Sequence, residues 1–304
     1  MTVEAELNRV APQKDMLLTI GVFDGVHLGH RYLIARLIEQ ARQQNLLSGI
    51  VTFRQHPLEV LSPETVLPYL TNLTEKVRLL KKEGVDEVIV LSFTRRLAGY
   101  SAHQFVGLLK KHLRLRGLVI GPDFVLGNNR EGNADVLRQL GREMGFSVTV
   151  LPPVNAGGEV VSSTLIRAVL AAGDMNKVAG LIGRPFSLQG RVITGAGRGA
   201  RLGFPTANIE IDPKQALPPD GIYVTLSYVD GKTCQSVTSI GLRPTFGNNE
   251  RTVETYIIDY DGNLYGRELR IDIVRRLRDE KRFENVEDLK KQIAEDVKLA
   301  RTLS

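Results

Sequence analysis

The 304 residues include a single cysteine, Cys234. One thiol excludes an internal disulfide and any metal site built from several cysteines. No apolar run approaches the roughly 18 residues that a membrane-spanning helix needs. The first fifteen residues also lack the basic-then-apolar order of a signal peptide. Together these absences favour a cytoplasmic protein that has no contact with a membrane.

Histidine is scarce as well: the chain has five, and all of them precede residue 113. Proton transfer in the second half of the chain would therefore have to come from another side chain, such as a carboxylate. The net charge of +6 invites a nucleic-acid interpretation. However, the basic residues are interspersed with acids, as in EKVRLLKKEG, which is typical of solvated helix faces. We expect small phosphorylated substrates and no nucleic acid.

Between Met16 and about Val150, short apolar runs alternate with helical patterns. The runs that predict strands are MLLTIGVF, GIVTF, EVIVL, GLVIG and SVTVL. The first helical stretch has one apolar face, made of Leu33, Ile34, Leu37, Ile38 and Ala41. Three more are NLTEKVRLLKKEG, SAHQFVGLLKKHL and NADVLRQLGREMG, the first two opened by the capping pairs Asn72–Glu75 and Ser101–Gln104. This alternation predicts a Rossmann-like parallel sheet, covered on both faces, whose ligands bind at the carboxyl ends of the strands.

After Gly183 the pattern changes to alternating strands. They are SLQGRVITG, GIYVTLSYV, TCQSVTSIG, VETYIIDY and ELRIDIVRRL, and Asp230-Gly231 between two of them signals a tight hairpin. This predicts a small antiparallel barrel. A terminal helix from Asn285 would face inward with Val286, Leu289, Ile293 and Val297. The sequence thus predicts two domains, residues 1–182 and 183–304.

The stretch TIGVFDGVHLGH places His27 and His30 where the first strand ends and the first helix begins. A helix N-terminus attracts phosphate through its unpaired N–H groups. Two imidazoles on the first turn can both donate hydrogen bonds to one anion. Three glycines allow the backbone to approach a ligand closely: Gly21, Gly25 and Gly29. The stretch therefore predicts a site for phosphoryl groups.

This stretch resembles the H-x-G-H signature of the nucleotidyltransferase superfamily. In its longer form, GVFDGVHLGH, it resembles the adenylyltransferase module of the bacterial bifunctional riboflavin kinase/FAD synthetase family. GPDFVLGNNREG, residues 121–132, is similar to that family's loop after the fourth strand. VSSTLIR, residues 161–167, is similar to its segment that contacts the phosphates of ATP.

The resemblance implies roles for three groups of residues. The catalytic residues of this module would be His27 and His30. The nucleotide and its phosphates would contact Gly21, Phe23, Asp24, Gly25, Gly29, Asp123, Ser162, Ser163, Thr164 and Arg167. The flavin would contact Phe53, His56, Pro57, Asn128 and Arg130.

In the second half, GAGRGARLGFPTANI, residues 195–209, resembles riboflavin kinase, and GLRPTFG, VETYIIDY and NLYG follow in that family's order. The resemblance implies that Thr206 and Asn208 hold Mg²⁺, whose preferred ligands are oxygen atoms. Backbone N–H groups of a glycine-rich loop can cradle phosphates, here through Gly195, Gly197 and Gly199. Because no histidine is available, the base would be the carboxylate of Glu254; a rim glutamate that faces solvent is the alternative.

Two modules in this order imply a bifunctional enzyme that uses Mg²⁺ with ATP. The second would phosphorylate riboflavin to FMN, and the first would join FMN and ATP to give FAD and pyrophosphate. Gln55 and Leu126 stand where the family usually has proline and phenylalanine. They motivate one alternative, a riboflavin kinase with a weakened adenylyltransferase module.

Another alternative is a non-catalytic regulator that binds flavin or RNA. The His27/His30 pair and Glu254 argue against it, because a protein that only binds needs neither. Weak self-association of the chain is left open.

Overall fold

The computed structural model describes residues 2–195, 197–242 and 251–302 of the chain. The chain divides into two compact units, the first ending at Ser163 and the second beginning at Thr164. The first is built on a parallel sheet and the second on a closed barrel, as the sequence predicts. In the described residues, every helix is too short or too polar to cross a bilayer.

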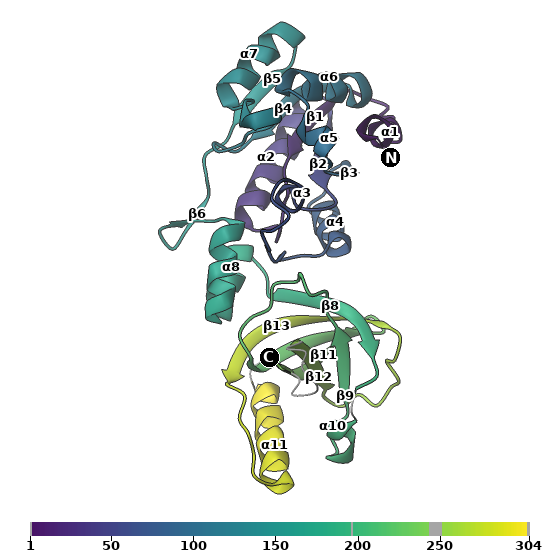
Figure 1. Ribbon diagram of the computed structural model, residues 1–304, viewed down its shortest axis with the longest axis vertical. Coiled ribbons are helices and arrows are strands. Elements are labelled where there is room, and N and C mark those ends of the chain that lie inside the picture. Colours follow the sequence, from purple (N-terminus) through teal and green to yellow (C-terminus); the bar gives the residue numbers. More distant parts are fainter. Residues whose placement is uncertain (1, 196, 243–250, 303–304) are drawn as a thin grey trace. The chain divides into compact units, whose positions relative to one another are not determined.

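The first unit contains a five-stranded sheet in the order β3-β2-β1-β4-β5, with all neighbouring strands parallel (Figure 1). The predicted apolar runs all form strands: β1 (Met16–Ile20), β2 (Leu47–Phe53), β3 (Glu87–Leu91), β4 (Leu115–Ile120) and β5 (Ser147–Val150). The predicted helices are α2 (Leu28–Gln43), α4 (Leu73–Lys82), α6 (Ala102–Leu113) and α7 (Ala134–Met144). Helices α2 and α4 pack in one buried cluster, and α6 and α7 pack in another. The sheet is therefore covered on both faces.

Capping explains where two of these helices begin. The Asn72 side chain accepts a hydrogen bond from the Glu75 N–H at 2.8 Å. Ser101 and Gln104 form a reciprocal capping box, with bonds of 2.9 and 3.1 Å. Each cap satisfies N–H groups that have no partner within the helix. Both predicted capping pairs are thus confirmed.

Several short elements are not evident in the sequence. They are α1 (Val3–Asn8), α3 (Pro57–Leu61), α5 (Arg95–Ala98), the 3₁₀ turn η1 (Asn128–Arg130) and the hairpin of β6 (Asn155–Ala156) and β7 (Glu159–Val160). Helix α1 is held by tertiary contacts: the Glu6 carboxylate accepts bonds from the N–H and hydroxyl of Ser92 at 2.8 and 2.7 Å. Six residues are too few for a helical period to stand out or for a helix to be stable alone.

The second unit contains a closed six-stranded barrel in the order β10-β11-β12-β9-β8-β13. The five predicted strands are β8 (Phe186–Ile193), β10 (Gly221–Val229), β11 (Lys232–Leu242), β12 (Arg251–Ile257) and β13 (Glu268–Arg278); β9 (Thr206–Glu210) is the sixth. Asp230 and Gly231 connect β10 and β11, with φ of 51° and 75°. Two consecutive left-handed residues are the geometry of a type I′ hairpin.

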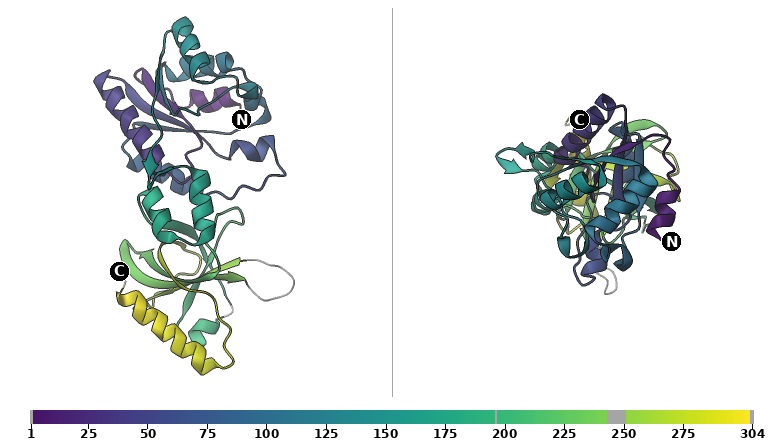
Figure 2. Two further views of the ribbon diagram at one scale, coloured as in Figure 1. Left: turned by 90° about the vertical axis from the view of Figure 1, so that its left-hand side faces the viewer. Right: turned by 90° about the horizontal axis from the view of Figure 1, so that it is seen from above.

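Hydroxyl groups fill part of the barrel interior. Val224 and Val237 pack under the terminal helix α11 (Val286–Thr302), so this face of β10 and β11 is the outer one (Figure 2). The opposite face carries a fully buried set that hydrogen-bonds at 2.7–2.9 Å, namely Thr225, Ser227, Ser236, Thr238 and Thr255. Buried hydroxyls are tolerated there because they satisfy one another.

The predicted inward face of α11 is partly wrong. Val286 is 56% exposed, whereas Leu289, Ile293 and Val297 are half-buried. The fully covered residues of this helix are Asp296 and Ala300. The Arg278 guanidinium donates three bonds of 2.7–3.2 Å to the Asp296 carboxylate. Val286 and Ile293 are seven residues apart and lie on nearly the same side of the helix, so Val286 is exposed because it is the first residue of the helix and not because the helix is rotated.

Three helices remain: α8 (Ser163–Ala172), which begins at the last residue of the first unit, α9 (Met175–Ile182) and the short α10 (Arg198–Arg201). Helix α9 packs against β8 and β13. Its buried side chains are Met175, Val178, Leu181 and Ile182. The predicted domain boundary between residues 182 and 183 stays a prediction. Because α9 packs against the barrel, a fragment that begins before α9 keeps these contacts, whereas one that begins at Gly183 loses them.

We expect a fragment of residues 173–304 to be more stable to unfolding than one of residues 183–304, by about 3 kcal/mol. Burial of each large apolar side chain of α9 contributes about 1.5–3 kcal/mol, and the ordering of the helix offsets part of that sum. Urea unfolding of both fragments measures the difference. Equal stabilities would mean that α9 adds nothing to the barrel.

We also expect Arg278→Met to destabilise the second unit by about 3 kcal/mol, because it leaves the Asp296 carboxylate buried without its partner. The matched control is Arg301→Met, which removes an ion pair to Asp259 whose side chains are 49% and 71% exposed. An exposed pair contributes about 0–1 kcal/mol. Calorimetry of the full chain compares the two variants, and similar losses would contradict the assignment.

Candidate active sites

The first candidate site is the loop that connects β1 to α2, at the carboxyl ends of the parallel strands. Its backbone is left-handed at Phe23, Gly25 and Val26, with φ of 54°, 83° and 40°. Non-glycine residues in this region cost about 1–3 kcal/mol each and persist only where their surroundings hold them. A side chain at Gly25 would also lie 2.9 Å from the Leu70 side chain. The loop is therefore held in one shape by its neighbours.

The buried Asp24 carboxylate is the main support of this loop. It accepts bonds from the backbone N–H of Leu70 at 2.9 and 3.0 Å and from that of Thr71 at 3.0 Å. The Gly25 N–H in turn donates to the Thr71 hydroxyl at 3.1 Å. These bonds tie the loop to the segment before α4. The contact between Asp24 and a nucleotide stays a prediction.

His27 and His30 lie side by side at the start of α2. Their rings stack, with centroids 3.6 Å apart and planes at 19°. His27 caps the helix, because its Nδ1 accepts the N–H of His30 at 3.4 Å. Its proton is therefore on Nε2, which can donate to a ligand. A side chain at Gly29 would lie 3.1 Å from the His27 ring, so glycine allows this packing.

His30 is held as a neutral imidazole. Burial lowers its pKa well below the usual value, and the neighbouring His27 and Lys76 lower this pKa further. The ring edge of Phe23 packs on it at a centroid distance of 5.0 Å. Its Nδ1 is buried and has no hydrogen-bond partner among the described residues. A polar atom in this state points to a ligand that would complete it.

Ser163, which opens α8 and is the last residue of the first unit, contacts the same loop. The Ser163 hydroxyl donates to the backbone carbonyl of Asp24 at 2.9 Å. Ser162 precedes this helix, and Thr164 and Arg167 lie within its first turns. Gly21 lies directly after β1, where an added side chain would be 3.1 Å from the Phe23 ring. Asp123 is exposed after β4. Their contacts with a nucleotide stay predictions.

The predicted flavin residues cluster around α3 and η1. Phe53 ends β2 and is buried, with its ring edge against Phe93 at 5.3 Å. His56 caps α3 by accepting the Leu58 N–H on Nδ1 at 3.1 Å, and Pro57 is the first residue of that helix. These contacts give His56 a structural role, whereas its contact with a flavin stays a prediction.

Asn128 and Arg130 lie in η1 and are exposed. Asn128 lines a surface hollow with residues of α3 and α5: Val60, Leu61, Arg95, Ala98 and Gly99. The two departures from the family pattern have structural partners. The Gln55 amide donates to the Phe93 carbonyl at 2.7 Å, and Leu126 is buried in the sheet's core.

The second candidate site lies on the outer face of the barrel. Strands β9 and β12 are antiparallel, with Asn208 opposite Glu254 and Thr206 opposite Tyr256. Directly opposed residues share a face of the sheet. The Thr206 hydroxyl lies 3.5 Å from a Glu254 carboxylate oxygen and donates to it. Asn208 is buried and Glu254 is half-buried. The structure thus brings the three predicted residues together.

Two of the predicted glycines are required by close packing against this site. A side chain at Gly195 would lie within 2.2–2.8 Å of the Asn208 amide. One at Gly199 would lie 2.4 Å from the Phe204 carbonyl and 3.3 Å from the Thr206 hydroxyl. Gly197 caps α10 with a φ of 67°. Ala196 of this loop lies outside the described residues.

A hollow of about 130 Å³ adjoins Thr206. It lies between the ends of the strands and the loop before β13. Its lining includes Val192, Pro205, Thr206, Ala207, Thr255, Ile257 and residues 260–265. The Phe204 ring packs edge-on against Tyr256 at 5.4 Å nearby. A mixture of polar and apolar groups of this kind is typical of small-molecule sites.

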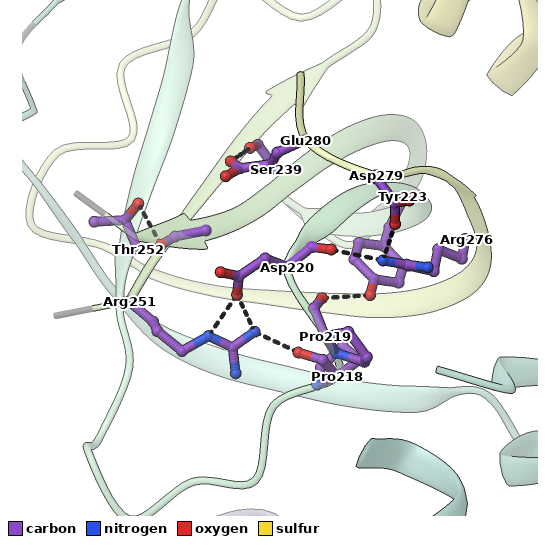
Figure 3. A network of polar contacts seen from close by, with 11 residues as sticks. Pro218, Pro219, Asp220, Tyr223, Ser239, Arg251, Thr252, Arg276, Asp279 and Glu280 are labelled. Atoms are coloured by element: carbon purple, nitrogen blue, oxygen red, sulfur yellow. Dashed lines mark hydrogen bonds and ion pairs between the residues drawn. The ribbon is translucent and has the colours of Figure 1, made fainter. Parts of the chain in front are cut away.

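An arginine missed by sequence reasoning fixes the start of β12 (Figure 3). Arg251 forms an ion pair with Asp220 at 2.6 Å and also donates to the carbonyl of Pro218. Arg251 lies three residues before Glu254 on the same strand, so this contact anchors the strand that carries the carboxylate. Nothing in the sequence marks it, because its partners are distant along the chain.

A second arginine completes the same network (Figure 3). Arg276 donates to the Asp220 carbonyl at 2.7 Å and to the Asp279 carboxylate at 2.6 Å. Tyr223, beside it, donates to the Pro219 carbonyl, and burial raises the pKa of its phenol. The Ser239 hydroxyl, opposite Glu254 on β11, donates to Glu280 at 3.2 Å. A second carboxylate therefore approaches this face of the barrel.

Comparisons with known proteins match two successive parts of the chain. A family model described as FAD synthetase matches residues 10–165, and one described as riboflavin kinase matches residues 182–304. The bifunctional riboflavin kinase/FMN adenylyltransferase of Escherichia coli (strain K12) is 39% identical over 96% of this chain and 93% of the relative. A protein of the same name from Pseudomonas fluorescens is 38% identical over 98% of this chain and 96% of the relative.

Among solved structures, a crystal structure described as a macrolide-efflux protein from Streptococcus pneumoniae matches with a TM-score of 0.88. The two sequences are 29% identical, and the match covers 96% of each chain. The curated relatives and both family models agree on one assignment over nearly the whole length. The chain belongs to the bifunctional riboflavin kinase/FMN adenylyltransferase family.

Proposed function

We propose that this chain makes FMN and FAD in two steps with ATP. The second unit phosphorylates riboflavin to FMN, and the first unit joins FMN to the AMP part of ATP and releases pyrophosphate. The observation that carries the proposal is the meeting of Thr206, Asn208 and Glu254 on one face of the barrel. Those residues are the ones that phosphoryl transfer to an alcohol needs, and the stacked His27–His30 pair provides the donors for the other step.

In the kinase step, the hydroxyl oxygen of riboflavin attacks the γ-phosphorus of ATP, and ADP leaves. The Glu254 carboxylate accepts the proton of that hydroxyl as the attack takes place. The hollow beside Thr206 receives part of the nucleotide. The donor set fits a hard cation, because the hydroxyl of Thr206, the amide of Asn208 and the carboxylate of Glu254 share one face of the barrel. Gly195 leaves room beside the Asn208 amide. Thr206 and Asn208 would hold Mg²⁺, which neutralises phosphate charge when bound.

In the adenylyl step, the phosphate of FMN is itself the nucleophile. An oxygen of FMN attacks the α-phosphorus of ATP, and the bond to pyrophosphate breaks. His27 and His30 each donate one N–H to the phosphoryl oxygens as negative charge builds on them. Ser162 and Ser163 contribute further phosphate contacts. Neither nucleic acid nor a membrane takes part.

The first experiment is incubation of the full chain with riboflavin, Mg²⁺ and ATP, followed by chromatography of the flavins. We expect FMN first and FAD later. FMN without FAD would support the alternative of a weakened adenylyltransferase. The absence of both products, with flavin or RNA retained on the protein, would overturn the proposal in favour of a regulator.

We expect His30→Ala to reduce FAD formation from supplied FMN by about 10²–10³, because one preorganised donor to the phosphoryl oxygens is lost. FMN formation from riboflavin should be unchanged, since it takes place in the other unit. His103→Ala, an exposed histidine on α6, is the control. Loss of FMN formation in His30→Ala would show that the two activities are assigned to the wrong units.

We expect Glu254→Gln to slow FMN formation by about 10²–10⁴ at saturating substrates, because the amide keeps the shape but accepts no proton. Formation of FAD from supplied FMN should be unaffected. Glu210→Gln, at the exposed end of β9, is the matched control. A Glu254→Gln rate within a few-fold of the wild type would exclude Glu254 as the base.

A further inference from the structure

A buried lysine lies beneath the loop of the first site. Lys76 of α4 is 5% exposed. Its Nζ donates to the carbonyl of Phe53 at 2.8 Å and to that of Val22 at 3.1 Å. Phe53 ends β2, and Val22 follows β1 by two residues. The ammonium group thus joins the ends of two neighbouring parallel strands, at the edge where such sheets bind ligands.

The Val22 carbonyl is a well-defined anchor for the loop. It also accepts the Thr52 hydroxyl at 3.1 Å, so both of its lone pairs are used. The next residue, Phe23, has the left-handed φ of 54° and packs against the His30 ring. A backbone held in this unfavourable region depends on its immediate supports. Lys76 therefore acts on the residue that places Phe23 and His30.

The charge of Lys76 lacks a paired anion. In the described part of the chain, no carboxylate lies within ion-pair distance of its Nζ, and the groups it bonds are neutral carbonyls. Asp24 acts on it at longer range, and the Asp24 carboxylate is bonded to Leu70 and Thr71. A buried cation without a close anion is unfavourable unless another anion approaches. The polyphosphate of a nucleotide at the loop would be such an anion.

We propose that Lys76 is a positioning residue for adenylyl transfer, which clamps the ends of β1 and β2 under the loop and adds a buried positive charge that favours the phosphates of ATP at the His27–His30 pair. The proposal rests on the proposed function of the first unit. It assigns to Lys76 no contact with the substrate, because its Nζ already bonds two backbone carbonyls.

A change of pH separates the effect of the Lys76 charge from the effect of its packing contacts. Burial lowers the pKa of Lys76 to about 8, and Asp24 opposes this shift. Lysine is charged below its pKa, so the effect on ATP is present below about pH 8 and is lost as the pH rises through that value. The titratable groups that face it are Asp24 in the loop and His30 at the start of α2, with His27 stacked on His30. As classes, carboxylates, imidazoles and phosphate monoesters titrate below this range.

The test is steady-state FAD formation by the full chain from FMN and MgATP across this pH range. For the wild type, kcat/KM for ATP should fall as the pH rises through about 8. Lys76→Met should lower kcat/KM near pH 7 by about 10²-fold, as small misplacements of reacting groups do, and should lack the fall at high pH. Lys76→Arg should restore part of the activity and move the fall out of range, because a guanidinium keeps its charge above pH 12.

The matched control is Lys81→Met, an exposed lysine on the same helix, which should behave as the wild type. FMN formation should be equal in all variants. Lys76→Met within a few-fold of the wild type, or a wild-type kcat/KM that is flat through pH 8, would overturn the proposal. The flat wild-type profile decides the matter even if Lys76→Met fails to fold. A wild type that forms FMN but no FAD would instead overturn the proposed function of the first unit.

Discussion

The Asp24 carboxylate is bonded to two consecutive N–H groups at Leu70 and Thr71, and the Asp24 carbonyl accepts the hydroxyl of Ser163. Three segments that are far apart in the sequence therefore meet at one residue. The left-handed turn at Phe23, Gly25 and Val26 depends on this junction, since its backbone is unfavourable in isolation. The stacking of His27 on His30 depends on this backbone geometry.

In the second unit, strand register sets the positions of the candidate residues relative to one another. Glu254 is opposite Asn208 on one neighbouring strand and Ser239 on the other. A slip of one residue would turn Glu254 into the barrel and place Val253 or Thr255 opposite Asn208. Arg251 and Asp220 fix one end of β12, and the closed barrel leaves this strand no free edge. The geometry of three residues is thus set by interactions along the whole strand.

The sequence was most informative where structure is local. The apolar runs, the caps at Asn72 and Ser101, and the Asp230–Gly231 turn each depend on residues a few positions apart, and all of them were predicted. The motifs also brought together His27 with His30 and Thr206 with Glu254, although their roles stay predictions. Long-range contacts could not be predicted. Helix α1 depends on Ser92, the burial of Asp296 on Arg278, and the burial of Lys76 on two distant carbonyls, none of which leaves a local pattern.

The barrel interior has a consequence for the hollow beside Thr206. The five buried hydroxyls have five protons, one each: Thr225, Ser227, Ser236, Thr238 and Thr255. They form four hydrogen bonds with one another, and each bond uses one proton. One proton is therefore left over for an acceptor outside the set. Thr255 is at one end of this series of hydrogen-bonded hydroxyls and also lines the hollow. A molecule in the hollow thus adjoins the end of a row of hydrogen-bonded hydroxyls that runs across three strands, in which the orientation of each hydroxyl constrains that of its neighbours.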